Sequence, residues 1–299
     1  VTLLVIERAA RRRQRYAGGA QKSRPMVPQR LKGSGALLAI GLLAVPVLLG
    51  FIAPATYLLV RAIERLGFAG FPPGLVQVTL DTLWLAGWAT LITVLAALVL
   101  AYAPRLRPGA LAAGSERIAT LGYAIPGTVL GIGLLVPLGV ADDWLAQLIE
   151  AVTGERAGLL LLGTSVAVII AYCTRFLAVA TGNIDAGFAR ITPALDHAGR
   201  TLGATAGGVL RRIHLPLLRP ALAAAALLVF VDCMKELPAT LLLRPLNVET
   251  LATHVYAEAA RGTYEDGAIA ALLIIVAGLA PVILLSRVGA RQGAEGPVT

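Results

Sequence analysis

The chain is short of charged and aromatic residues, which make up only 14% and 5% of its 299 residues. Soluble domains usually carry about 25% charged residues, so the deficit indicates that lipid surrounds most of the chain. Scarce aromatics argue against an outer-membrane β-barrel, whose rims carry aromatic girdles. The apolar fraction is 57% and the mean hydropathy is +0.78. We therefore predict an all-α, polytopic membrane protein.

The residues that carry most enzyme and metal chemistry are also few. Lys22, Lys32 and Lys235 are the only lysines, and none lies in a phosphate-binding loop of the Gly-x-x-x-x-Gly-Lys-Ser/Thr type. The three histidines are dispersed without a zinc-binding spacing, and the two cysteines lie in apolar runs without a Cys-x-x-Cys motif. We predict no catalytic residue, no fixed metal and no cofactor, and an intramembrane enzyme lacks the necessary groups. Any ATP hydrolysis would belong to a separate subunit.

Six apolar stretches are each long enough to cross a bilayer, which takes about 20 helical residues. Several contain proline, which lipid-embedded helices tolerate only where neighbouring helices or a water-filled path satisfy the freed backbone. A packed bundle around a conduit and a bundle with purely structural kinks both fit these prolines. Gly127 and Gly131 form a small-xxx-small pair that permits close helix contact. The predicted spans are 36–60, 82–103, 118–140, 157–180, 219–243 and 266–286.

Basic and non-basic connections alternate along the chain. The arm 1–35 has nine basic residues against Glu7, whereas the connection 235–266 has three basic and five acidic residues. Positive charge is retained on the cytoplasmic side of a membrane. We therefore predict that both termini and the connections 104–117 and 181–218 are cytoplasmic, in a bacterial inner membrane. The same topology accounts for the net charge of +9, so no nucleic-acid partner is expected.

The cytoplasmic connection 194–217 is the most informative stretch. Residues 194–202 can form a short helix that Gly203 ends, because glycine accepts the left-handed conformation. A second short helix is expected over 209–215, and Pro216 leads into the fifth span. One interpretation is a rigid knob that transmits the motion of a partner. The other is an amphipathic loop lying on lipid headgroups.

The spacing within this connection resembles the EAA loop of type I ABC importer permeases, Glu-Ala-Ala-x3-Gly-x9-Ile-x-Leu-Pro. The match departs from the family pattern at two positions, where His197 replaces the glutamate and Gly199 replaces the second alanine. The adjacent Asp196 is a candidate to supply the missing carboxylate. The resemblance implies a loop that docks on a cytoplasmic ATPase. Its expected residues are Asp196, His197, Ala198, Gly199, Arg200, Leu202, Gly203, Ile213, Leu215 and Pro216.

A second stretch, 229–253, is similar to the second half of ferric-iron importer permeases, which usually carry two homologous halves in one chain. The resemblance covers about 36–288 and implies the MetI-like fold. It further implies that 1–35 is a linker or remnant of a preceding half, that 36–288 is the permease domain and that 289–299 is a cytoplasmic tail. We expect either a truncated product or a split permease. The implied partners are an ABC ATPase dimer, a periplasmic binding protein, a second permease half or homodimer partner, and lipid.

Three charged residues lie in the fifth predicted span, where charges are costly and are functional candidates by default. Asp232, Lys235 and Glu236 are therefore candidates for the translocation path, because carboxylate oxygens suit a hard cation. The alternative is an ion pair between Lys235 and a carboxylate of a neighbouring helix. Arg175 is expected near the cytoplasmic end of the fourth span, with its guanidinium reaching the interface.

The substrate is indicated by resemblance alone. Ferric iron is the first expectation, and related permeases for thiamine, phosphonates or polyamines are alternatives. An ion-driven secondary transporter is a further alternative, but that class requires broken helices in internal repeats with charges near the midplane. Apart from Asp232, the midplane of these spans is nearly free of charge.

Overall fold

The structure is a computed structural model that describes residues 32–294 except 107–108, 110–113, 115–117 and 120. The described residues form helices and connections, with no strand among them, which confirms the all-α prediction. The helices are α2 (Ser34–Val47), the π-helix η1 (Leu48–Ile52), α3 (Ala53–Ala69), α4 (Leu75–Leu106), α6 (Gly127–Thr153), α7 (Ser165–Phe188), α8 (Pro193–Thr201), α9 (Ala206–Val209), the π-helix η2 (Leu210–His214), α10 (Leu215–Met234), α11 (Pro238–Leu243), α12 (Leu251–Arg261) and α13 (Tyr264–Ala294).

The chain divides into two units, residues 1–52 and 53–299. In the first unit the structure describes α2 and η1, where no side chain is buried and Pro46 lies inside α2. The second unit contains the remaining helices and every site discussed below. Most of the predicted arm 1–35 lies outside the described residues, as do the last residues of the predicted tail.

Five helical runs among the described residues are long and apolar enough to cross a membrane. They are Ser34–Ala69, Leu75–Leu106, Gly127–Thr153, Ser165–Phe188 and Ala206–Met234. The sixth predicted span lies inside α13, which has 31 residues. The third predicted span began too early, because the chain turns at Pro126 before α6 starts at Gly127.

The fourth predicted span, 157–180, was placed eight residues too early. Leu160, Leu161 and Leu162 are apolar enough to be taken for a helix, but they form the connection into α7. Their backbone N–H groups donate to the buried Asp142 carboxylate of α6, at 2.8, 2.7 and 2.9 Å. Thr164 then caps α7 by accepting from the N–H of Val166.

The fifth predicted span, 219–243, has different ends from those expected. Hydrogen bonding runs without a break from α9 through η2 into α10, so the second short helix of the connection 194–217 is continuous with the span. The π-turn precedes Pro216, which has no N–H to donate. At the other end α10 stops at Met234, and Pro238 starts the separate helix α11.

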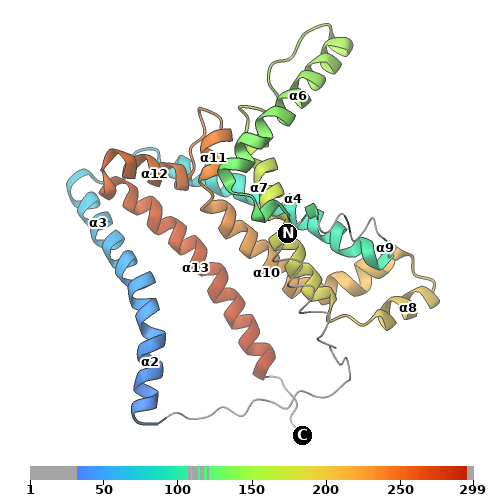
Figure 1. The fold of residues 1–299 in the computed structure, drawn as a ribbon, viewed down its shortest axis with the longest axis horizontal. Helices are drawn as coiled ribbons and strands as arrows, with labels where there is room; N and C mark the ends of the chain where they lie inside the picture. The colour runs from blue at the N-terminus through green and yellow to red at the C-terminus, as the bar shows by residue number, and fades with distance from the viewer. Residues whose placement is uncertain (1–31, 107–108, 110–113, 115–117, 120, 295–299) are drawn as a thin grey trace, which may run out of the picture. The chain divides into compact units, whose positions relative to one another are not determined.

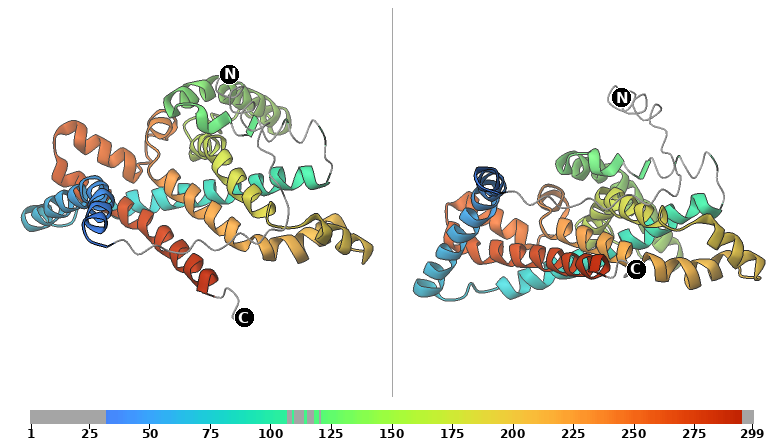
Figure 2. Two further views of the ribbon diagram at one scale, coloured as in Figure 1. Left: turned by 60° about the horizontal axis from the view of Figure 1, so that its bottom comes forward. Right: turned by 90° about the horizontal axis from the view of Figure 1, so that it is seen from below.

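The centre of the second unit is the packing of α4, α7 and α10 against one another, which both views in Figure 2 show. Within lipid, helices associate through close packing and interhelical hydrogen bonds rather than by escape from water. Small side chains allow that approach. The fully or almost fully buried residues here include Ala89, Ala97, Ala167, Ala180 and Ala225.

Candidate functional site

The connection 194–217 folds as a knob of two helices, α8 and α9, followed by η2. α8 starts with Pro193 in its first turn and ends at Thr201, and Gly203 then adopts a φ of +81°. Thr205 caps α9 by accepting from the N–H of Gly208 at 3.2 Å. The predicted first helix and its glycine end are therefore confirmed, whereas the second helix, expected over 209–215, starts at Ala206 and continues through η2 into α10. The tip of the knob is Leu202, whose side chain is 87% exposed.

Gly199 is the contact point between the two arms of the knob. A Cβ atom on Gly199 would lie 2.9 Å from Val209 Cγ2 and 3.1 Å from Ile213 Cδ1. The glycine thus allows α8 to approach the helical segment that leads into α10. Beside this contact lies a groove of about 240 Å³, lined by Gly199, Leu202, Gly203, Ala204, Gly208, Val209, Arg212 and Ile213.

Asp196 is held inside the knob by two partners. One carboxylate oxygen contacts Nε2 of the fully buried His214, and the other accepts from Arg105 Nη1 at 3.2 Å. Both carboxylate oxygens are therefore bonded to residues of the chain itself. The exposed residues on α8 that follow Asp196 are His197, Ala198, Arg200 and Thr201. Of these, His197 occupies the position where the family pattern has glutamate.

Arg105 joins the end of α4 to the end of α7. Its Nη2 donates to the carbonyl oxygens of Phe188 at 2.6 Å and Ile191 at 2.8 Å, and its guanidinium lies 4.9 Å from the Phe188 ring centroid. Tyr102, one turn earlier on α4, donates to the Ala206 carbonyl at 2.8 Å. The rings of Tyr102, Phe188 and His214 pack together, with centroids 5.4 to 6.0 Å apart.

Tyr102, Arg105 and His214 were not among the residues predicted for this site. Arg105 counted only as one positive charge, and His214 occupies the unspecified position of the Ile-x-Leu-Pro match. Among the predicted residues of this loop, Leu215 and Pro216 form the first turn of α10. Ile213 packs against Gly199, as described above.

The charged residues of the fifth span form two separate pairs. Lys235 Nζ lies 2.8 Å from Asp232 Oδ1, and the Lys235 side chain is 60% exposed. Glu236 is 6% exposed, and its Oε2 lies 3.3 Å from Arg175 Nε. The alternative pairing of Lys235 with a neighbouring helix is therefore wrong, because Glu236 makes the pair between helices.

The expected position of Arg175 is wrong. Since α7 covers Ser165–Phe188, Arg175 lies near its middle rather than at an end. Its guanidinium turns to Glu236, in the break between α10 and α11. Gly127 and Gly131 confirm the predicted close contact, because Cβ atoms there would clash with this ion pair and with Leu242 Cδ1, respectively.

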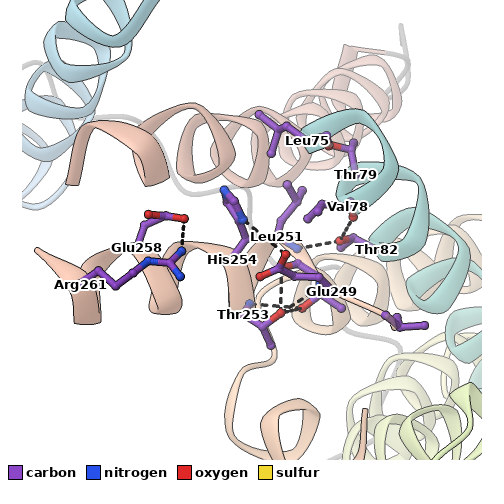
Figure 3. Close-up of polar contacts among 12 residues, drawn as sticks. Leu75, Val78, Thr79, Thr82, Glu249, Leu251, Thr253, His254, Glu258 and Arg261 are labelled. Carbon is purple, nitrogen blue, oxygen red and sulfur yellow. Dashed lines mark hydrogen bonds and ion pairs between the residues drawn. The ribbon is translucent and has the colours of Figure 1, made fainter. Parts of the chain in front are cut away.

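The helix α12 carries a third group of polar residues (Figure 3). Thr250 and Thr253 form a capping box at its start, and the N–H of Leu251 donates to Thr82 Oγ1 of α4 at 2.8 Å. His254 Nδ1 lies 3.6 Å from Glu249 Oε2. Among the described residues, no three His, Cys, Asp or Glu side chains are arranged to hold a metal ion.

Glu258, near the end of α12, is hydrogen-bonded within its own helix and to the connection between α12 and α13. Arg261 donates to Oε1, and the Thr263 hydroxyl lies 2.6 Å from Oε2. Burial acts to raise the pKa of Glu258, but the hydrogen bonds from Thr263 and Arg261 outweigh it and hold the pKa below its usual range.

The chain is similar to permeases of known transport systems. It is 26% identical over 275 residues to the Fe(3+)-transport system permease protein FbpB 2 of Haemophilus influenzae, covering 91% of this chain and 51% of that protein. It is 28% identical over 170 residues to the putative 2-aminoethylphosphonate transport system permease protein PhnV of Salmonella typhimurium, covering 57% of this chain and 58% of that protein. The chain thus spans little more than half the length of these relatives.

The fold has counterparts among solved structures. A chain of the bacterial alginate ABC transporter in complex with an alginate pentasaccharide-bound periplasmic protein has a TM-score of 0.64 at 18% identity, covering 88% of this chain and 96% of that chain. A second structure of a bacterial alginate importer has a TM-score of 0.62 at 19% identity. Residues 89–292 match the model of the family described as binding-protein-dependent transport system inner membrane component, and the chain belongs to that family.

Proposed function

We propose that this chain forms the membrane path of an ATP-driven importer and that the knob of α8, α9 and η2 couples it to a separate cytoplasmic ATPase dimer. One observation carries the proposal: the knob is continuous with α10 and is bonded through Asp196 and Arg105 to the end of α4. A force on α8 would therefore act on the spans directly. An amphipathic loop resting on lipid would need no such connections.

The coupling surface proposed here consists of the exposed part of the knob. Leu202 and the adjacent groove present apolar area, and His197, Ala198 and Arg200 flank it on α8. On the other side of the membrane a periplasmic binding protein would deliver the substrate. A second permease half, or a second copy of the chain, would complete the path. Both termini are placed in the cytoplasm, following the distribution of basic residues.

Ferric iron is the proposed substrate, and the similarity to the Fe(3+) permease FbpB 2 over 91% of the chain supports it. A 2-aminoethylphosphonate is the second candidate, on the similarity to PhnV. Asp232, Lys235 and Glu236 remain the proposed polar residues of the path. Two uptake measurements distinguish these substrates, one with radiolabelled ferric iron and one with labelled 2-aminoethylphosphonate. Each is made in a strain that lacks only this gene and in the same strain with the gene restored. If the strain without the gene takes up both compounds normally, both proposed substrates are refuted.

The coupling role is tested by Gly203→Ala with Gly207→Ala as its matched control. No atom lies within 4 Å of a Cβ at either position, but only Gly203 has a positive φ. A side chain in that conformation costs about 1–2 kcal/mol, so the end of α8 should shift. We expect the tagged Gly203→Ala chain to capture less of the ATPase subunit from solubilised membranes, while Gly207→Ala captures it normally. Equal capture by both variants would contradict the proposal.

A further inference from the structure

The pair of the partly buried Arg175 and the buried Glu236 lies where several helices meet. Glu236 follows the end of α10, and its Oε1 accepts from the N–H of Ala239 in the first turn of α11, at 3.2 Å. Its Oε2 lies 3.3 Å from Arg175 Nε, near the middle of α7. A single charge inside a membrane protein is costly unless it is paired. Each of these residues therefore needs the other, and the pair joins α7 to the break between α10 and α11.

The first residue of α6 closes over this pair. A Cβ on Gly127 would lie 2.4 Å from Arg175 Nη1 and 2.7 Å from Glu236 Oε1. One turn later, a Cβ on Gly131 would lie 3.4 Å from the Cβ of Leu242 in α11. Neither glycine has a side chain to interlock with α11. At these two positions α6 therefore lies close to α11 without interdigitating with it.

Two links connect α7 to the break between α10 and α11, and they differ in how completely their polar groups are hydrogen-bonded. The Thr240 hydroxyl donates to the Glu236 carbonyl at 2.7 Å, so the Tyr172 hydroxyl donates to Thr240 Oγ1, also at 2.7 Å. This neutral link is complete. In contrast, Arg175 Nε and Nη1 are buried atoms that find no hydrogen-bond partner among the described residues. Buried donors without partners are unfavourable, so the charged link is the one that another arrangement can improve.

We propose that Arg175 and Glu236 are positioning residues that form a latch, holding the start of α6 against α11 in the arrangement described here. In the transport cycle α6 separates from α11 at Gly127 and Gly131, while the Tyr172–Thr240 link keeps α11 on α7. The proposal rests on the proposed function, because an importer has to alternate between inward-facing and outward-facing arrangements.

The separation of α6 from α11 is tested with the double variant Gly131→Cys/Leu242→Cys. The 3.4 Å between the two Cβ positions is close to the 3.5–4.5 Å that a disulfide spans, and removing Leu242 relieves its contact with position 131. We expect the oxidised variant to be inserted and assembled but inactive in uptake, and to recover when the disulfide is reduced. The two single variants, treated with the same oxidant, control for Cys173 and Cys233. Full uptake by the cross-linked protein would overturn the proposal.

The role of the charges is tested by the reactivity of Gly131→Cys toward a maleimide, in a chain that also carries Leu242→Ala to remove the Cδ1 atom that a side chain at position 131 would contact. Glu236→Gln keeps an acceptor for Ala239 but removes the charge that attracts Arg175. We expect it to raise the maleimide reaction rate at position 131 by about 10-fold, which corresponds to about 1.4 kcal/mol. The double change Glu236→Gln/Arg175→Met should remain inserted, since it leaves no unpaired charge, and should show the same rise. Unchanged rates in both would refute the latch.

A third comparison perturbs the pair without removing a charge. In the chain with Gly131→Cys and Leu242→Ala, Gly127→Ala should displace the Arg175 and Glu236 side chains and raise the maleimide rate, whereas Gly133→Ala, on the same helix with no atom within 4 Å, should not. Equal rates would contradict the proposed contact. Because maleimide reactivity depends on neither substrate nor ATPase, an unaltered reactivity rejects the latch alone. Loss of all transport by the unmodified protein would instead reject the proposed function.

Discussion

Gly199 offers a prediction that runs against the pattern of the family. The EAA loop usually has alanine at this position, so Gly199→Ala would restore the family residue. In this chain the added Cβ would lie 2.9 Å from Val209 Cγ2 and 3.1 Å from Ile213 Cδ1. Contacts this short force neighbouring atoms to move, and overpacking of this kind costs about 1–3 kcal/mol. Alanine also favours the helix over glycine by about 1 kcal/mol, so a control that shares this gain is needed.

Gly207→Ala provides that control, because Gly207 lies in α9 and has no atom within 4 Å of its Cβ position. We expect the knob of α8, α9 and η2 to be less stable in Gly199→Ala than in Gly207→Ala by about 1–3 kcal/mol, since both changes add an alanine to a helix of the knob. Hydrogen exchange measures such local opening, and the difference corresponds to α8 amides exchanging about 5 to 150 times faster. Capture of the ATPase should fall in parallel. Equal or slower exchange in Gly199→Ala would refute the packing argument.

Three further predictions concern topology, the membrane charges and pH. Leu202→Cys and Leu246→Cys, at positions 87% and 104% exposed, should react with an impermeant thiol reagent from opposite sides of the membrane, and labelling of position 202 from the periplasm would overturn the coupling role. Asp232→Leu should reduce uptake while leaving membrane insertion unchanged, and normal uptake would remove Asp232 from the path. The pKa of Glu258 is lower in the folded protein, so its contribution to stability is complete above about pH 5 and is lost as the pH falls below about 4. Glu258→Gln should therefore flatten the dependence of Tm on pH over that range. An unchanged profile would contradict the assigned hydrogen bonds.

The knob was predictable from the sequence because its signals are local. Pro193, Gly203 and the Ile-x-Leu-Pro ending each act within a few residues, through a fixed φ or a missing N–H. The structure places α8 within one residue of the expected helix and gives Gly203 its positive φ. What the sequence could not indicate was that η2 merges with α10, since a π-turn has no simple residue pattern.

The errors arose where distant residues decide the structure. Leu160 to Leu162 form a connection only because Asp142, about 20 residues earlier, accepts their N–H groups. Arg175 looked like an interfacial arginine because the span was placed too early, and its partner Glu236 lies 61 positions further along the chain. Hydropathy registers the apolar character of such a segment but not the single buried carboxylate that folds it back. Side-chain partners across a bundle cannot be deduced from one sequence.

The knob and the break between α10 and α11 differ in how their charges are used. At the knob, Arg105 donates to three oxygens and Asp196 has a partner on each oxygen, so α4, α7, α8 and η2 form one firmly bonded unit. At the break between α10 and α11, Arg175 is paired but its nitrogens Nε and Nη1 find no hydrogen-bond partner among the described residues, so their N–H groups stay unsatisfied there. If the knob couples to an ATPase as proposed, a movement imposed on it would be transmitted by the satisfied network and taken up where the bonding is incomplete. We infer that the helices would turn as a unit from the knob and separate first at α6.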